Sequence, residues 1–392
     1  MKNHRPLVLV FALLALIISA CSQPQDMQTP ALEAQFGGAG YDTADAVSVA
    51  KNGVVTIGNN LTSLPDSKNH VYQDVQLRQL DASGRLLRQV SVSKVRCTET
   101  GLECVLQEFL DIRNDSQGNV YALTTAAVDS QDVPIHALTI YKYNSTLQKL
   151  LWKKEIKYVD PASRSSLGLD SNGNVYVAFT PRTSTDGGYY RQGVPQFIRY
   201  STNGVKWYQR NSRVGKINDL AVSSTGDIYV VGDKGLSRYN NGGGLIWTKA
   251  VPGSAVAATA THSYVLNNQL YSVNMRGNSE RWDIVSASTT PIGVETDTLG
   301  NVYVRGYERF SPDDIQETPL GYIEKFSASG KSIWSTTLPF AYSFRLNDIA
   351  TYDGSNVYAV GSTDGTVNGV NRGSLDAFVI RLNAPGQQIW ER

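Results

Sequence analysis

Carboxylates are the side chains in this sequence that come closest to forming a chemical site. Four aspartates recur at the innermost strand of a repeated pattern, namely Asp45, Asp111, Asp219 and Asp348. Around a central channel, such a ring of carboxylates could bind a cation such as calcium. The alternative is that each aspartate caps a turn or strand inside its own repeat. We favour this structural role because a functional site usually breaks repeat symmetry.

No other residue type forms a catalytic pattern. Beyond the first twenty residues, the histidines His70, His136 and His262 fall in three different repeats and lack the spacing of a preassembled zinc site. No serine stands in a Gly-x-Ser-x-Gly turn, and no glycine-rich phosphate loop precedes a helix. We therefore predict a non-enzymatic protein with no cofactor and no metal.

The composition of the chain argues against two classes of binding partner, nucleic acids and anionic membrane surfaces. The 392 residues include 36 Lys and Arg against 35 Asp and Glu, for a net charge of +1. A nearly neutral chain has no electrostatic case for binding nucleic acid or an anionic membrane surface. Only 18% of residues are charged, which argues against a disordered polyelectrolyte or a coiled coil. The 34 Gly and 21 Tyr favour strands joined by turns.

The N-terminus has the pattern of a targeting segment. Residues 1–20 begin with Lys2 and continue as an apolar run too short to span a bilayer comfortably. The small residues before Cys21 resemble the lipobox of bacterial lipoproteins, which implies cleavage and acylation, with palmitate for example, at Cys21. An ordinary cleavage site with a chance cysteine is the alternative. Ser22 follows, without the aspartate that retains such proteins at the inner membrane, so the resemblance implies an outer-membrane or cell-surface location.

Residues 21–34 then read as a polar tether between the lipid anchor and the folded domain. Two further cysteines, Cys97 and Cys104, are separated by six residues that include Gly101. In an oxidising compartment this spacing predicts a disulfide across a tight hairpin. Metal binding is the rival interpretation, but two thiols without a neighbouring histidine make an incomplete site.

A short turn motif recurs along the chain and decides the fold. Each copy places Asp or Ser early and Gly late between two apolar-alternating stretches, which is typical of a β-hairpin. Glycine adopts positive φ at no steric cost, and the aspartate bonds the backbone of its own turn. The clearest copies are DSQGNVYAL (115–123), DSNGNVYVA (170–178), SSTGDIYVV (223–231), DTLGNVYVR (297–305) and YDGSNVYAV (352–360).

A second motif, a strand that ends in a turn followed by tryptophan, gives the number of repeats. All six tryptophans stand at this one place, and Leu87 fills it in the first copy. The count gives seven units, the fifth of which lacks the Gly-Asn-Val-Tyr turn. We expect each tryptophan on an outer strand, packed between neighbouring units. The six are Trp152, Trp207, Trp247, Trp282, Trp334 and Trp390.

Seven units of four strands, closed radially, predict an all-β fold: a seven-bladed β-propeller over residues 35–392. QFGGAGYDTADAVSV (35–49) and GSLDAFVIRLNAPGQQIWER (373–392) resemble the SBBP-type propeller repeats of bacterial envelope proteins. That resemblance implies a fold rather than a reaction. We further expect residues 31–38 to dock beside, or continue, the outer strand of unit seven and so close the ring.

Long connections between the second and third strands break the symmetry. In a propeller they emerge on one face, where binding residues gather on a rigid scaffold. Within them we single out an aromatic and guanidinium cluster as a binding surface for protein or glycan. Its members are Tyr189, Tyr190, Arg191, Tyr307, Arg309 and Phe310. The alternative is that these loops vary freely and only cover blade edges.

Together these features predict a lipid-anchored scaffold of the bacterial cell envelope that binds protein or glycan partners at its loop face. One alternative is an outer-membrane assembly scaffold, by architectural analogy with the propeller lipoprotein of the barrel-insertion machinery. Another is a propeller hydrolase or lyase with its active site at the channel mouth. Carboxylates with shifted pKa that converge in a pocket would favour an enzyme, whereas a flat apolar and aromatic patch would favour a partner.

Overall fold

The computed structural model describes most of the chain beyond the tether. Described are residues 35–63, 66–67, 71–97, 107–128, 135–160, 164–184, 190–284, 289–308, 320–338, 344–365, 371 and 373–391. All of them belong to the unit that spans Glu33–Arg392. Every regular element among them is a strand, and none is a helix long and apolar enough to cross a membrane.

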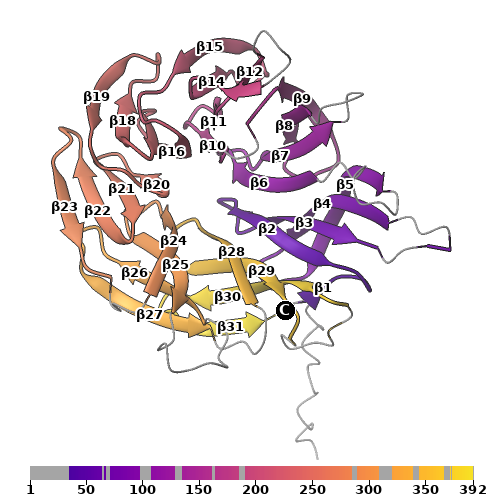
Figure 1. The fold of residues 1–392 in the computed structure, drawn as a ribbon. Coiled ribbons are helices and arrows are strands. Elements are labelled where there is room, and N and C mark those ends of the chain that lie inside the picture. The colour runs from indigo at the N-terminus through magenta and orange to yellow at the C-terminus, as the bar shows by residue number, and fades with distance from the viewer. Residues whose placement is uncertain are drawn as a thin grey trace, which may run out of the picture. The chain divides into compact units, whose positions relative to one another are not determined.

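Seven four-stranded antiparallel blades follow one another in chain order, each running from an inner strand to an outer one (Figure 1). Blade 1 holds β2 (Asp42–Val49), β3 (Val55–Thr62), β4 (Val71–Leu80) and β5 (Leu86–Cys97). Blade 2 holds β6 (Gln107–Asn114), β7 (Val120–Val128), β8 (Ile135–Tyr143) and β9 (Leu150–Lys157). Blade 3 holds β10 (Ser166–Leu169), β11 (Val175–Phe179), β14 (Gln196–Tyr200) and β15 (Lys206–Asn211).

Blade 4 holds β16 (Ile217–Val222), β17 (Ile228–Gly232), β18 (Gly235–Tyr239) and β19 (Leu245–Lys249). Blade 5 holds β20 (Ala255–Ala258), β21 (His262–Asn267), β22 (Gln269–Asn274) and β23 (Ser279–Trp282). Blade 6 holds β24 (Thr289–Thr296), β25 (Val302–Glu308), β26 (Gly321–Phe326) and β27 (Ser332–Leu338). Blade 7 holds β28 (Phe344–Thr351), β29 (Asn356–Thr363), β30 (Asp376–Asn383) and β31 (Gln388–Glu391). The predicted seven-bladed propeller is confirmed, and unit five keeps its four strands.

The recurrent turn joins the first and second strands of a blade. In blade 2, Gly118 takes φ 79° and the Asp115 carboxylate accepts the backbone N–H groups of Gln117 and Asn119 at 3.0 and 2.9 Å. The same carboxylate accepts the Tyr121 hydroxyl at 3.2 Å, which anchors the turn to the buried second strand. Sequence and turn chemistry therefore agree.

The N-terminal segment closes the ring. β1 (Gln35–Phe36) pairs antiparallel with Phe378 and Ala377 of β30, whereas β31 pairs with residues 380–382 of the same strand. β1 thus continues the outer-strand position of blade 7, which confirms the closure hypothesis for the described part of residues 31–38. Phe36 is buried, and the Arg78 guanidinium of blade 1 lies 4.5 Å from its ring centroid.

Most outer-strand tryptophans link neighbouring blades as predicted. The Trp152 indole N–H donates to the Thr202 carbonyl, in the turn between the last two strands of the next blade, at 2.9 Å. Trp247 and Trp334 make the equivalent bonds to Met275 and Ala384 at 3.0 and 2.9 Å. Trp282 is buried, with its ring 6.1 Å from that of Phe326 in blade 6.

The prediction is wrong for Trp207 and Leu87. Trp207 is 57% exposed, because the next residue, Tyr208, faces Arg199 of β14 and donates its hydroxyl to the Asn241 carbonyl at 3.0 Å. A shift of one residue moves a strand side chain to the opposite face. For the same reason Leu87 is 46% exposed. The side chain of Trp390 lies outside the described residues.

Candidate functional site

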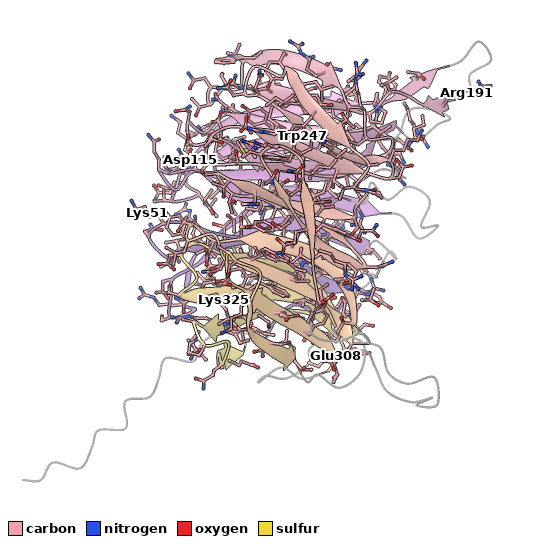
Figure 2. The ribbon with its side chains drawn as sticks, turned by 90° about the vertical axis from the view of Figure 1, so that its left-hand side faces the viewer. Lys51, Asp115, Arg191, Trp247, Glu308 and Lys325 are labelled. Atoms are coloured by element: carbon pink, nitrogen blue, oxygen red, sulfur yellow. The ribbon has the colours of Figure 1, made fainter. Side chains whose placement is uncertain are left out.

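The two ends of the propeller differ. Figure 2 shows Lys51 and Asp115, from turns between first and second strands, at one end and Arg191, beside a connection between second and third strands, at the other. On the side of the second-to-third connections, a cavity of about 440 Å³ opens among the starts of the inner strands. We call it the acidic chamber. Its charged lining consists of Asp45, Glu108, Asp111, Asp160, Asp219, Glu295 and Asp348 with Arg113, Arg164 and Arg305.

The recurrent aspartates do converge on this chamber, but their structural bonds cross between blades. Asp111 Oδ2 accepts the backbone N–H of Leu167 at 3.1 Å, and Asp219 Oδ2 accepts that of Val256 at 2.9 Å. Asp348 Oδ2 likewise accepts the backbone N–H of Val47, on the inner strand of blade 1, at 3.0 Å. The expected structural hydrogen bond is therefore present, but for these three aspartates it reaches the next blade. Asp219 also accepts the N–H of Leu220 in its own blade at 2.7 Å. The inner strands shift register immediately before these aspartates, and such a bulge re-aims a side chain.

Asp45 is a variant of this arrangement. It is itself the bulged residue of β2, one position before the equivalent of the other three aspartates. Its Oδ2 accepts the Asn60 amide of β3 at 2.6 Å. Burial raises the pKa of Asp45 to about 7, with Glu108 adding to the rise.

An ion pair across the channel forms the floor of the chamber. Arg113 Nη2 of β6 lies 3.1 Å from Glu295 Oε1 of β24, and Arg113 Nε lies 3.4 Å from Asp111 Oδ1. Blades 2 and 6 stand on opposite sides of the ring (Figure 1). Both residues also line a second cavity of about 230 Å³ toward the other end of the channel. The pair therefore separates the channel into two compartments.

The sequence carries a signal for this pair that motif searching missed. Alignment of the strand registers places Arg113 and Glu295 at one position of the inner strand. The other five blades have small residues there, namely Ser48, Gly168, Ala221, Ala257 and Ala350. Two long side chains of opposite charge in a layer of small ones are placed to meet across the axis.

Acids outnumber cations at the floor. Burial raises the pKa of Asp111 to about 8, against the effect of Arg113 and with the help of Asp348. Burial also raises the pKa of Asp219, Asp348 and Glu295. The second guanidinium there, that of Arg305, is 3.9 Å from Asp348 Oδ1 and donates to the Leu346 carbonyl at 3.1 Å. Four carboxyl groups thus share two guanidinium groups.

The described carboxylates of the chamber do not gather into a metal-binding group. Within the described part of the chain, no three His, Cys, Asp or Glu side chains form a group that could hold a metal. Asp111, Asp219 and Asp348 each accept a backbone N–H group of the next blade, so one oxygen of each carboxylate is already hydrogen-bonded. His136, at the side of the chamber, has its pKa lowered by burial and by the nearby Arg182. Of the three histidines weighed above, His262 lies far from this chamber, and His70 lies outside the described residues.

The predicted aromatic and guanidinium cluster is not assembled by the described residues. Arg191 is exposed on β13 (Tyr190–Gln192), which pairs with β12 (Arg182–Ser184) beside blade 3. Tyr307 belongs to blade 6, and its hydroxyl accepts the Leu346 N–H at 2.8 Å, which ties blades 6 and 7 together. Neither residue lines the chamber. The side chain of Tyr190, and all of Tyr189, Arg309 and Phe310, lie outside the described residues.

The predicted disulfide and lipidation sites also fall outside the described part. Cys97 ends β5, but its side chain and all of Cys104 and Cys21 are not described.

Comparison with known proteins finds other propellers at low similarity. No protein-family model matches the chain, and no curated protein matches it. A streptogramin B lyase is 10% identical, with 88% of this chain and 95% of that one covered and a TM-score of 0.49. Sqt1 of Saccharomyces cerevisiae is 8% identical over 89% and 98%, with a TM-score of 0.46. A luciferin-regenerating enzyme is 11% identical over 88% and 92%, with a TM-score of 0.41. Two of these three structures are named as enzymes, and likeness at this level carries no argument about activity.

Proposed function

We propose that this protein is a non-enzymatic binding propeller whose acidic chamber receives the basic side chain of a protein partner. The observation that carries the proposal is the excess of carboxyl groups over guanidinium groups at the chamber floor, on the side of the long connections. Burial is the main cause of the raised pKa values of Asp111 and Asp348, and the neighbouring guanidinium groups only partly offset it. A lysine or arginine side chain that enters the chamber supplies a further positive neighbour.

The chamber also limits what can enter. A cavity of about 440 Å³ accommodates one long side chain but no folded segment. The bound cation favours the ionised form of Asp111 and its neighbours, so binding releases protons near neutral pH. A neutral side chain of the same shape gains no such stabilisation.

The cellular setting rests on the sequence. The lipobox-like segment that ends in Cys21 supports an anchor in the bacterial cell envelope, in the outer membrane or at the cell surface. Tethered there, the propeller presents its chamber to envelope proteins, and an assembly scaffold is one form of this role.

A second candidate, a hydrolase or lyase, is favoured by one specific observation. Asp45 and Asp111, with pKa of about 7 and about 8, open on the same chamber as His136. General acid–base catalysis works best with groups that titrate near the operating pH. An enzyme would be distinguished from a binding protein by chemical conversion of the bound ligand.

Calorimetric titration tests the binding proposal. The probe is a capped Gly-Arg-Gly peptide, and its control is the same peptide with citrulline, a neutral isostere of arginine. We expect saturable binding of the arginine peptide alone, weakened about tenfold or more by the double variant Asp219→Asn with Asp348→Asn. Equal binding of both peptides, or no effect of the variant, contradicts the proposal. Cleavage of the peptide during prolonged incubation supports the enzyme instead.

A further inference from the structure

Several blades place a lysine or arginine of the third strand against the last turn of the next blade. In blade 2, Lys142 Nζ lies 4.8 Å from the ring centroid of Tyr121, a second-strand residue of the same blade. The ammonium also donates to the carbonyl of Thr202, in the last turn of blade 3, at 3.0 Å. We call this arrangement the cation clamp: a third-strand donor, a second-strand tyrosine and a turn carbonyl of the next blade.

Other blades repeat the donor part of the clamp. In blade 3, Arg199 lies 5.5 Å from the Tyr176 ring and donates to the Asn241 carbonyl at 3.1 Å. The remaining donors to turn carbonyls are Arg238 to Met275 at 2.5 Å, Arg381 to Ala82 at 2.6 Å and the Gln79 amide to Ser145 at 2.9 Å. In blade 6, Lys325 lies 5.2 Å from the Tyr303 ring.

Blade 5 keeps the tyrosine and the turn carbonyl of the clamp but lacks its donor. It also has Thr259 where the turns of blades 2 and 3 have Asp115 and Asp170, which lie 3.9 and 3.5 Å from their cations. The turn between β22 and β23 begins at Asn274, so the position of Lys142 falls on Ser272, which is buried and too short to reach the next blade. Tyr264 is present on β21, and Ala328 stands where blade 3 has Thr202. Among the described side chains, none donates to the Ala328 carbonyl.

A cavity of about 550 Å³ lies at this break in the repeat. Tyr264 and Ala328 line it, at the positions of the two groups, Tyr121 and Thr202, that contact the Lys142 ammonium of blade 2. The turn before β21 is shorter than in the other blades, with Thr259 bonded directly to His262, which leaves the space open. The described lining includes His262 and Asp297, whose carboxylate accepts hydrogen bonds from Asn301 and Tyr303, and it contains no lysine or arginine.

We propose that this cavity is a second ligand site that binds a guanidinium or primary ammonium group. The cation lies over the Tyr264 ring and donates to the Ala328 carbonyl, as the chain's own lysines and arginines do in other blades. The site is distinct from the acidic chamber, because it opens on the opposite side of the propeller and shares no lining residue with it.

Nuclear magnetic resonance of the tryptophan indoles tests this site on the whole domain. The Trp282 ring lies 5.3 Å from that of Tyr264, so its indole N–H reports on the cavity, whereas Trp247 is a control. The probe is methylguanidinium, and its neutral isostere is methylurea. We expect a saturable shift of the Trp282 signal with methylguanidinium, no shift of the Trp247 signal, and no response to methylurea.

A variant that places a lysine of the chain itself in the cavity tests whether the cavity binds a cation. Ser272→Lys supplies the missing donor, so it should weaken methylguanidinium binding about tenfold or more. Gln79→Lys, at the equivalent position of blade 1, should leave the Trp282 response unchanged. If Ser272→Lys does not fold, Tyr264→Leu takes its place, with loss of the response expected.

Two results overturn the proposal: no saturable shift of Trp282, or a shift that persists unchanged in Ser272→Lys. The ligand of this cavity could be a free small cation or a basic side chain of a partner protein. The capped Gly-Arg-Gly peptide distinguishes the two, because it shifts the Trp282 signal only if the cavity admits a side chain attached to a peptide backbone. The chamber variant Asp219→Asn with Asp348→Asn should retain the Trp282 response. Failure of the chamber proposal is therefore distinguishable from failure of this one.

Discussion

Replacement of Arg113 by methionine probes the charge balance at the chamber floor. Arg113 is the cation nearest to both Asp111, at 3.4 Å, and Glu295, at 3.1 Å. Methionine keeps much of the length of the side chain but removes its charge. Asp111 and Glu295 then lose the positive neighbour that lowers their pKa.

The expected loss of stability follows from the exposure of the pair. Removal of one partner from a fully buried ion pair costs about 3–5 kcal/mol, because the other charge is left unpaired. The Arg113 and Glu295 side chains are 31% and 25% exposed, so water offsets part of this cost. We expect the free energy of unfolding to fall by about 3 kcal/mol at about pH 8. The loss should shrink to about 1 kcal/mol or less at about pH 5.5, because Asp111, whose pKa burial raises to about 8, is protonated there.

Urea unfolding, followed by tryptophan fluorescence at both pH values, measures these differences. Arg85→Met is the matched control, since Arg85 pairs with Asp81 on the surface with a side chain that is 70% exposed, and its effect should stay below about 0.5 kcal/mol. The double variant Arg113→Met with Glu295→Gln should regain part of the lost stability at the higher pH. An Arg113→Met loss equal to that of the control, or independent of pH, refutes the charge-balance reasoning.

Three further outcomes are expected. The pKa values of about 7 for Asp45 and about 8 for Asp111 exceed those of an unfolded chain, so the folded state binds more protons and urea resistance should fall from about pH 5 to about pH 8; a rise over that range contradicts the assigned burial. Trp247→Ala should lower the free energy of unfolding by about 2–3 kcal/mol, because inter-blade packing and a hydrogen bond are lost, whereas Trp207→Ala should lower it by about 1 kcal/mol or less. Equal urea midpoints for the two variants would contradict the opposite facing of the two side chains. Phe36→Ala should cost about 3 kcal/mol in the same assay if β1 closes the ring, against almost nothing if it does not.

The fold was accessible from the sequence because one local signal repeats. Each turn such as Asp115 to Asn119 encodes its own hairpin, and seven hairpin-bearing units leave few architectures. The exact facing of single side chains was not accessible. In the sequence, Trp207 and Leu87 stand at the same place of the repeat as the other tryptophans. Whether a bulge or a slip of one residue intervenes depends on the packing of both neighbouring blades.

The candidate site could be predicted from the sequence only in part. Convergence of Asp111, Asp219 and Asp348 on the channel follows from their common place in the repeat. Their bonds to the next blade do not, because inter-blade contacts depend on the tilt of the inner strands. Arg113 and Glu295 stand more than 180 residues apart and obey no motif, so only the register of the strands reveals that they share one layer.

The most direct test of the acidic chamber as a cation site is the proton balance of binding. Titration of the capped Gly-Arg-Gly peptide in two buffers of different ionisation enthalpy gives the number of protons exchanged. The raised pKa values of Asp45 and Asp111 predict proton release and tighter binding at about pH 8 than at about pH 6. Binding without proton release, or binding that weakens as the pH rises, contradicts the assignment of this chamber.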